Sequence, residues 1–294
     1  MTDLAADAAP ARAGRSLSED ARRRLLRNPA AVASLWVLGA LGFLAAFGPM
    51  LWVHPVDALF RDDVGIAPTL RNFHWFGTDS EGRDLVARTL FGLRISLLVG
   101  IVATAVALSI GVVWGAVAGF VGGAVDAVMM RIVDVLYSIP FIFFVILLMV
   151  TFGRDLILIF AAIGCVEWLT MARIVRGQAI SLRRKEFIEA ARASGATPMQ
   201  IVFRHIVPNV LGPVVVFATL NVPVIILAES FLSFLGLGVQ EPLTSLGKLI
   251  VDGSRQMETS PWMLLFPAGA MVITLLALNF LGDGLRDALD PKDR

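Results

Sequence analysis

Long apolar runs with at most one charged side chain constrain the fold of this chain more than any other feature. Residues 30–52 form such a run of 23 residues, which as a helix is long enough to cross about 30 Å of hydrocarbon. Backbone polar groups inside a membrane have to be satisfied within the protein, so such runs predict helices. Further runs lie at residues 95–121, 132–150, 156–171, 206–234 and 262–281. The sequence therefore predicts an all-α, polytopic membrane protein with six transmembrane helices.

Composition supports the same class. The 294 residues are 57% hydrophobic and 17% charged, with a mean hydropathy of +0.77, which excludes an ordinary soluble domain. The net charge of +1 gives no indication of a nucleic-acid partner. The single cysteine, Cys165, lies in an apolar run, so neither a disulfide nor a thiolate metal site is expected. No internal repeat divides the chain, and we predict one membrane domain over residues 29–294.

Residues 1–28 form a polar, arginine-rich tail ahead of the first run. A cleaved signal peptide is the alternative interpretation, and it fails because the apolar run that follows is much longer than a signal-peptide core. Ser16 and Glu19 have the spacing of a capping box, so a short basic helix is expected at residues 17–27. We favour a positively charged anchor over a helix that lies along the inner membrane surface.

The distribution of basic residues predicts the topology. Six spans place both termini on one side, and the segments on that side hold 17 Lys and Arg residues: six before the first span, Arg131, seven from Arg173 to Arg204, and three in the C-terminal tail. The segments on the other side hold the remaining eight of 25. This bias predicts that the tail, the C-terminus and the loop at residues 182–205 are cytoplasmic, and that residues 54–94 form an outer segment.

The polar loop at residues 182–205 predicts two short helices that meet at a corner. Residues 184–194 are good helix formers, Gly195 can take the left-handed conformation that ends a helix, and Thr197 with Pro198 supplies a cap and first turn for the next one. Phe187 and Ile188 add an apolar knob. A solvated loop is the simpler alternative, but small side chains favour a helix that fits a partner's groove: Ala190, Ala191, Ala193, Ser194 and Gly195.

This loop resembles the EAA loop of permease subunits in binding-protein-dependent ABC importers, through the run from Glu189 to Ala191, Gly195 and Pro208. Two positions depart from the general pattern, since His205 replaces isoleucine and Val207 replaces leucine, but residues 204–209 are similar to the peptide-importer branch. The resemblance implies a type I importer permease fold. It also implies that the loop couples to an ATPase through Phe187, Glu189, Ala190, Ala191, Gly195, Thr197 and Pro198.

A second stretch, residues 74–96, resembles the hallmark Gly-Thr-Asp, Gly-Arg-Asp and Arg-x-Ser-Leu pattern of dipeptide, oligopeptide and nickel importer permeases. Its residues also predict a turn at Gly77 and a helix capped by Thr78 or Asp79. Several segments are most similar to the C-type permease of oligopeptide importers, and the oligopeptide substrate rests on that resemblance alone. Dipeptides and nickel remain the alternatives.

Two carboxylates lie inside apolar runs, Glu167 and Glu229. An unpaired charge there costs several kcal/mol, so such residues face a cavity or a partner. We expect each to be either a translocation-path or gate residue, or a buried hydrogen-bond partner between helices, with equal weight.

Prolines predict irregular spans. Pro140 predicts a kink in the third run, with Arg131 and Asp134 paired at its inner end. Breaks in the fifth run are expected at three prolines: Pro208, Pro213 and Pro223.

The leading hypothesis is a permease half in the bacterial cytoplasmic (inner) membrane. The resemblance implies four kinds of protein partner or surface: a homologous second permease, two ATPase subunits, a periplasmic or extracellular binding protein, and membrane lipid. No phosphate loop occurs in the sequence, so ATP and Mg belong to the ATPases and this chain needs no cofactor.

A secondary transporter is the second hypothesis, but no inverted repeat is visible. An intramembrane enzyme is third. Only three histidines occur, with no His-Glu-x2-His spacing, so we expect neither catalytic residues nor a metal site.

Overall fold

The computed structural model describes residues 17–153 and 155–289, and these residues are helical with no β-strand. The predicted all-α class is confirmed. Ser16, half of the expected capping box, lies outside the described residues. The helices are α1 Leu17–Arg27, α2 Pro29–Leu51, the 3-10 helix η1 Arg71–Phe73, α3 Leu85–Val121, α4 Gly123–Tyr137, α5 Phe141–Phe152, α6 Leu156–Leu182, α7 Glu186–Ala193, α8 Pro198–Ile201, the π-helical turn η2 Val202–Ile206, α9 Val207–Phe234, α10 Leu246–Arg255 and α11 Trp262–Leu289.

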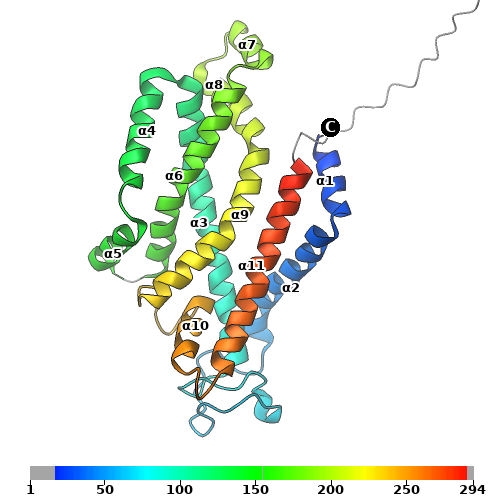
Figure 1. Ribbon diagram of the computed structural model, residues 1–294, viewed down its shortest axis with the longest axis vertical. Helices are drawn as coiled ribbons and strands as arrows, with labels where there is room; N and C mark the ends of the chain where they lie inside the picture. Colours follow the sequence, from blue (N-terminus) through cyan, green and yellow to red (C-terminus); the bar gives the residue numbers. More distant parts are fainter. Residues whose placement is uncertain (1–16, 154, 290–294) are drawn as a thin grey trace, which may run out of the picture.

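The long helices run side by side along the long axis of the molecule, with α3 at the centre (Figure 1). Helix α3 packs most extensively against α6 and also contacts α2, α9 and α10. Glycines on α3 allow the close approach to α6, since a Cβ added at Gly111 would lie 2.7 Å from the Cβ of Met171. Small residues serve this purpose in membranes, where helices associate through packing rather than through the hydrophobic effect.

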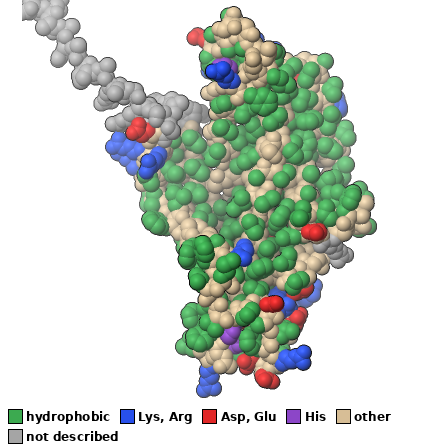
Figure 2. Space-filling model, turned by 180° about the vertical axis from the view of Figure 1, so that it is seen from behind, with side chains coloured by type: hydrophobic (Ala, Val, Ile, Leu, Met, Phe, Trp, Pro, Cys, Tyr) green, Lys and Arg blue, Asp and Glu red, His purple; other side chains and the backbone are tan. Residues whose placement is uncertain are grey.

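Five helical segments in the described residues are long and apolar enough to span a membrane: α2, α3, α6, the continuous segment Pro198–Phe234, and α11. Helices α4 and α5 meet at an angle of 79° and supply a sixth span if they act as one. The predicted kink before Pro140 is therefore confirmed. Hydrophobic side chains cover the middle of the molecule, and charges gather toward its two ends (Figure 2). Trp36 on α2 is 79% exposed, as expected of a surface that meets lipid or another membrane subunit.

Two predictions about the spans are wrong. Asp134 pairs with Arg173 on α6, at 2.9 Å, instead of with Arg131. Helix α4 lies against α6, so its acid faces that neighbour rather than its own helix. The three prolines also leave α9 unbroken: Pro208 lies in its first turn, and Pro213 and Pro223 lie inside the helix without ending it. The irregular turn comes just before it, in η2.

The two ends of the molecule are formed by different segments of the chain. The C-terminal end of α11 lies at the same end as α1, α7 and α8, whereas the loop between α2 and α3 lies at the opposite end with α10 (Figure 1). Both described ends of the chain therefore share an end with the loop at residues 182–205, as the even number of spans predicts.

The outer segment contains the predicted turn, because Gly77 has a φ of +79°. The predicted caps are wrong. Helix α3 begins later, and its N-cap is Asp84, whose carboxylate accepts a hydrogen bond from Ala87 N at 2.8 Å. Thr78 and Asp79 instead bond within the preceding loop, where Asp79 Oδ1 accepts from Arg83 N at 2.8 Å.

Candidate functional site

The corner between α7 and α8 is built from local signals in its sequence. Gly195 has a φ of +83°, a conformation that glycine adopts without a Cβ penalty, and it ends α7 as predicted. Thr197 caps α8, with its hydroxyl accepting from Gln200 N at 3.4 Å. The Gln200 side chain accepts in return from Thr197 N at 2.8 Å. This reciprocal pair fixes the direction in which the chain leaves the corner.

Apolar packing anchors the corner to the membrane helices. Ile188 is fully buried in a cluster with Val202 and Ile206, next to Met171 of α6 and Phe120 of α3. The prediction that Ile188 joins Phe187 in an apolar knob is wrong, because the Ile188 side chain lies on the face of α7 that packs into this cluster, whereas Phe187 points about 100° away around the helix. Phe187 is the exposed one, at 41%. Because of this packing, a displacement of the corner would also displace α3 and α6.

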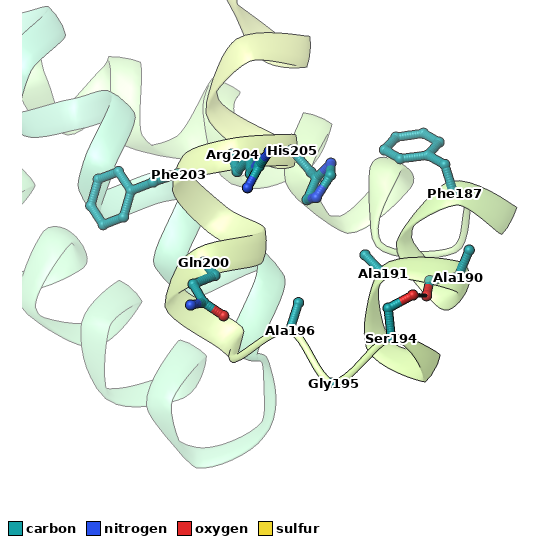
Figure 3. Close-up of a pocket in the computed structure, with 10 residues that line it drawn as sticks. All are labelled: Phe187, Ala190, Ala191, Ser194, Gly195, Ala196, Gln200, Phe203, Arg204 and His205. Atoms are coloured by element: carbon teal, nitrogen blue, oxygen red, sulfur yellow. Dashed lines mark hydrogen bonds between the residues drawn. The ribbon is translucent and has the colours of Figure 1, made fainter.

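An open groove of about 920 Å³ lies between α7 on one side and α8 with η2 on the other (Figure 3). Phe187 and Phe203 stand at its two sides, and the rings of Phe187 and His205 lie 6.5 Å apart. Small residues, Gln200 and Arg204 form the rest of its lining, and none of the described residues that line it is acidic. Such a groove suits an apolar or acidic element of a partner.

The groove brings together four of the predicted coupling residues and leaves out three. Phe187, Ala190, Ala191 and Gly195 line it. Glu189, Thr197 and Pro198 are exposed at the same corner but outside the lining. Six lining residues were not among the predicted coupling residues: Ser194, Ala196, Gln200, Phe203, Arg204 and His205. The sequence indicated these residues only weakly, through the capping-box spacing of Thr197 and Gln200 and through His205, which stands where the general pattern has isoleucine.

Glu229 is completely buried, and its environment favours the hydrogen-bond interpretation. Its Oε1 accepts from Ser233 at 2.8 Å and from Ser245 at 2.7 Å. Ser245 is also the N-cap of α10. Within the part of the chain that the structure describes, Oε2 has no hydrogen-bond partner. Glu229 thus fastens the loop before α10 to α9.

Glu167 is partly exposed and lies on α6. Its Oε2 accepts from the amide of Asn221 on α9 at 2.9 Å. The bond joins two spans, and the Glu167 residue as a whole stays partly exposed. Its role in a path stays a prediction.

A charged network at the opposite end of the molecule joins three stretches of chain. Glu241, in the loop before α10, accepts from Arg83 at 2.6 Å and from Arg88 at 3.1 Å. Burial raises the pKa of Glu241, but the charges and hydrogen bonds of Arg88 and Arg83 together outweigh it, and the pKa is lowered. Arg88 is only 1% exposed, so water could not take the place of Glu241 beside its guanidinium if the pair were broken.

The bundle of apolar spans, with the protruding corner at one end and the polar loop between α2 and α3 at the other, defines a multi-pass membrane protein. The comparisons agree. The chain belongs to the family described as "Binding-protein-dependent transport system inner membrane component", which matches residues 111–294. Residues 16–68 match the N-terminal transmembrane domain of oligopeptide transport permease C. Membership confirms the predicted resemblance and the transport role, as opposed to that of an enzyme.

Relatives extend the match over nearly the whole chain. The chain is 62% identical to the oligopeptide transport system permease protein OppC of Escherichia coli K12, over 96% of this chain and 93% of that protein. It is 44% identical to OppC of Bacillus subtilis, over 95% and 91%. It is 45% identical to the dipeptide transport system permease protein DppC of the same organism, over 95% and 87%.

Proposed function

We propose that this chain is one permease half of an ABC importer for oligopeptides. With a homologous second permease it forms the translocation path, a binding protein delivers the substrate, and two ATPase subunits supply the energy. The observation that carries the proposal is the 62% identity to a protein named for oligopeptide transport, over 93% of that protein's length. The 45% identity to a dipeptide permease makes dipeptides the second candidate.

The proposed orientation places the corner and both termini in the bacterial cytoplasm. The corner, α1 and the end of α11 share one end of the molecule (Figure 1). The segments assigned to that end carry 17 of the 25 basic residues. The rule that cytoplasmic loops are rich in Lys and Arg supports this placement in the inner membrane.

Coupling requires that the ATPases bind the corner differently in the two states of the path. Moving an equilibrium from 1:99 to 99:1 takes about 5.5 kcal/mol, which is more than one weak surface contact supplies. ATP and Mg bound by the partner ATPases provide this energy in our proposal. The buried anchor at Ile188 passes the motion to α3 and α6, while Phe187, the small residues and Glu189 meet the ATPase.

In the same proposal Glu167 lines the path, because it is accessible between α6 and α9. Glu229 acts at the outer gate only through its hold on the loop before α10, since it is fully buried in this conformation.

The test is ATP-dependent uptake by the complete importer in proteoliposomes. Labelled tetrapeptide should accumulate with ATP, and unlabelled tri- to pentapeptides should compete with it. Dipeptides and Ni²⁺ should compete poorly. Competition by dipeptides alone would replace the oligopeptide assignment with the dipeptide one, and uptake independent of the ATPases would contradict the importer itself.

A further inference from the structure

The outer loop between α2 and α3 holds two histidines and two aspartates in one cluster. His54, His74 and Asp84 form the one group of potential metal-ligating side chains found in the described residues, with ligand atoms within 4.8 Å of one another. Asp63 joins them, since its Oδ2 lies 3.8 Å from His74 Nε2. His74 and Asp84 are both 0% exposed.

The proton on His74 can be placed from its partner. His74 Nδ1 lies 2.8 Å from Asp84 Oδ2. The other oxygen of Asp84 accepts from Trp52 Nε1 and from Ala87 N, both at 2.8 Å. An ionised carboxylate with these donors only accepts, so Nδ1 of His74 carries a hydrogen and donates it. In the neutral ring, Nε2 then holds a lone pair.

His54 is held in the equivalent way. Its Nε2 lies 2.6 Å from the backbone carbonyl oxygen of Asn72, which can only accept. Nε2 therefore donates, and Nδ1 keeps the lone pair. Each histidine thus gives one N–H to a fixed oxygen and offers its other nitrogen as a base. This is how proteins orient histidines that ligate metals.

The unsatisfied atom in the cluster is His74 Nε2. It is buried and has no hydrogen-bond partner among the described residues, and it faces the carboxylate of Asp63. A lone pair and a carboxylate that face each other repel unless a positive charge lies between them. Tetrahedral zinc bonds of about 2.0–2.2 Å place two ligand atoms about 3.3–3.6 Å apart. The Asp63 side chain is 29% exposed and needs to move only slightly from 3.8 Å.

We propose that this cluster is a binding site for a divalent transition metal such as Zn²⁺, ligated by His74 Nε2, His54 Nδ1 and Asp63. Two imidazoles select this class over Mg²⁺ and Ca²⁺, which prefer oxygen ligands. The His54 ring is stacked on His74 at 4.6 Å, and it has to tilt out of the stack to share a metal with it. Asp84 orients His74 without touching the metal. Bound metal ties residues 54, 63 and 74 together and braces the start of α3.

The experiment measures metal binding in the purified, complete importer after removal of metals with a chelator. Zn²⁺ is titrated against a coloured competitor, and Co²⁺ is added separately so that its visible absorption reports nitrogen and oxygen ligands. We expect one tight site for each copy of this chain. Asp63→Asn and His54→Gln should bind at least tenfold more weakly, because each loses one ligand.

The matched control is Asp62→Asn, which removes a neighbouring exposed carboxylate and should bind like the wild type. Both test positions are at least partly accessible, and a thermal melt of each metal-free variant checks that it folds. Equal binding by wild type and Asp63→Asn would overturn the proposal, because it would place the metal elsewhere. Absence of any Co²⁺ absorption would overturn it as well, and would leave a proton on His74 Nε2 as the charge between the two groups.

Discussion

The corner between α7 and α8 and the polar segment at residues 54–94 lie at opposite ends of the molecule (Figure 1), and they are fixed by opposite means. The corner is capped locally and anchored by buried aliphatic side chains such as Ile188. The outer segment is held by polar bonds across long stretches of sequence, such as those of Glu241 with Arg83 and Arg88. An apolar anchor leaves the polar surface of the corner free for a partner. The polar fastening of the outer segment engages Arg83, Arg88 and Glu241 with one another.

The largest expected effect comes from bulk at the free surface of the corner. Gly195→Arg should abolish peptide uptake, because a cationic side chain enters the groove and the left-handed conformation costs about 1 kcal/mol. A Cβ built at Gly195 meets no atom of this chain within 4 Å, so the protein itself should still insert and pair with the second permease. Uptake and subunit stoichiometry are measured on the same reconstituted sample.

Gly195→Asn is the control for backbone strain, since asparagine tolerates the left-handed conformation better than other residues. It should retain most of the uptake and keep the ATPases bound. Full uptake by Gly195→Arg would show that the corner is not where the ATPases act.

Breaking the charged network of Glu241, Arg83 and Arg88 should lower the stability of the protein and leave its coupling to the ATPases unchanged. Glu241→Gln removes the nearer of two carboxylates from the buried guanidinium of Arg88 and leaves only Asp79, at 3.5 Å, and we expect a loss of about 1–3 kcal/mol in unfolding free energy. Thermal melting at neutral pH measures it. Glu258→Gln, an exposed glutamate at the same end, should melt like the wild type.

The pH dependence of the same variant sharpens the test. The pKa of Glu241 is lower in the folded protein than its ordinary value. Its contribution is therefore present above the unfolded pKa and is lost as pH falls through the folded one. The melting temperature of the wild type should fall on acidification, and that of Glu241→Gln should fall less, because the variant lacks the contribution of the Glu241 carboxylate. Equal acid sensitivity of the two proteins would show that the network does not hold the outer segment.

A smaller effect is expected from the rim of the groove. Arg204→Ala removes an exposed cation that lines it, and exposed charge pairs are worth about 0.2–1 kcal/mol. ATPase affinity should fall by up to about fivefold and depend less on salt. Arg184→Ala, an exposed arginine outside the groove, should leave affinity and its salt dependence unchanged. Equal losses in both variants would mean that only net charge matters.

The same contrast explains what could be predicted from the sequence. The spans follow from apolar runs, and the corner follows from Gly195 and Thr197, because these signals lie within a few residues of the structure they determine. The inward face of Ile188 and the pairing of Asp134 with Arg173 depend on which helices become neighbours. The meeting of His54, Asp63 and His74 depends on a folded loop with no regular period. Bonds such as that between Arg88 and Glu241 join residues far apart in sequence and could not be predicted from either one alone.

The smallest expected effect concerns Glu229, which belongs with the polar fastening of the outer end despite lying in an apolar run. Glu229→Gln keeps an oxygen that accepts from Ser233 and Ser245, so the loop before α10 should stay attached and uptake should remain within about twofold of wild type. Glu229→Leu fills the volume without an acceptor. It leaves both hydroxyls unsatisfied in a buried site, and the melting temperature should fall in this variant alone. A collapse of uptake in Glu229→Gln with normal amounts of assembled complex would mean that the charge itself acts in transport. In that case a charge at the end opposite the corner would also act in transport, and the two ends would no longer differ in this respect.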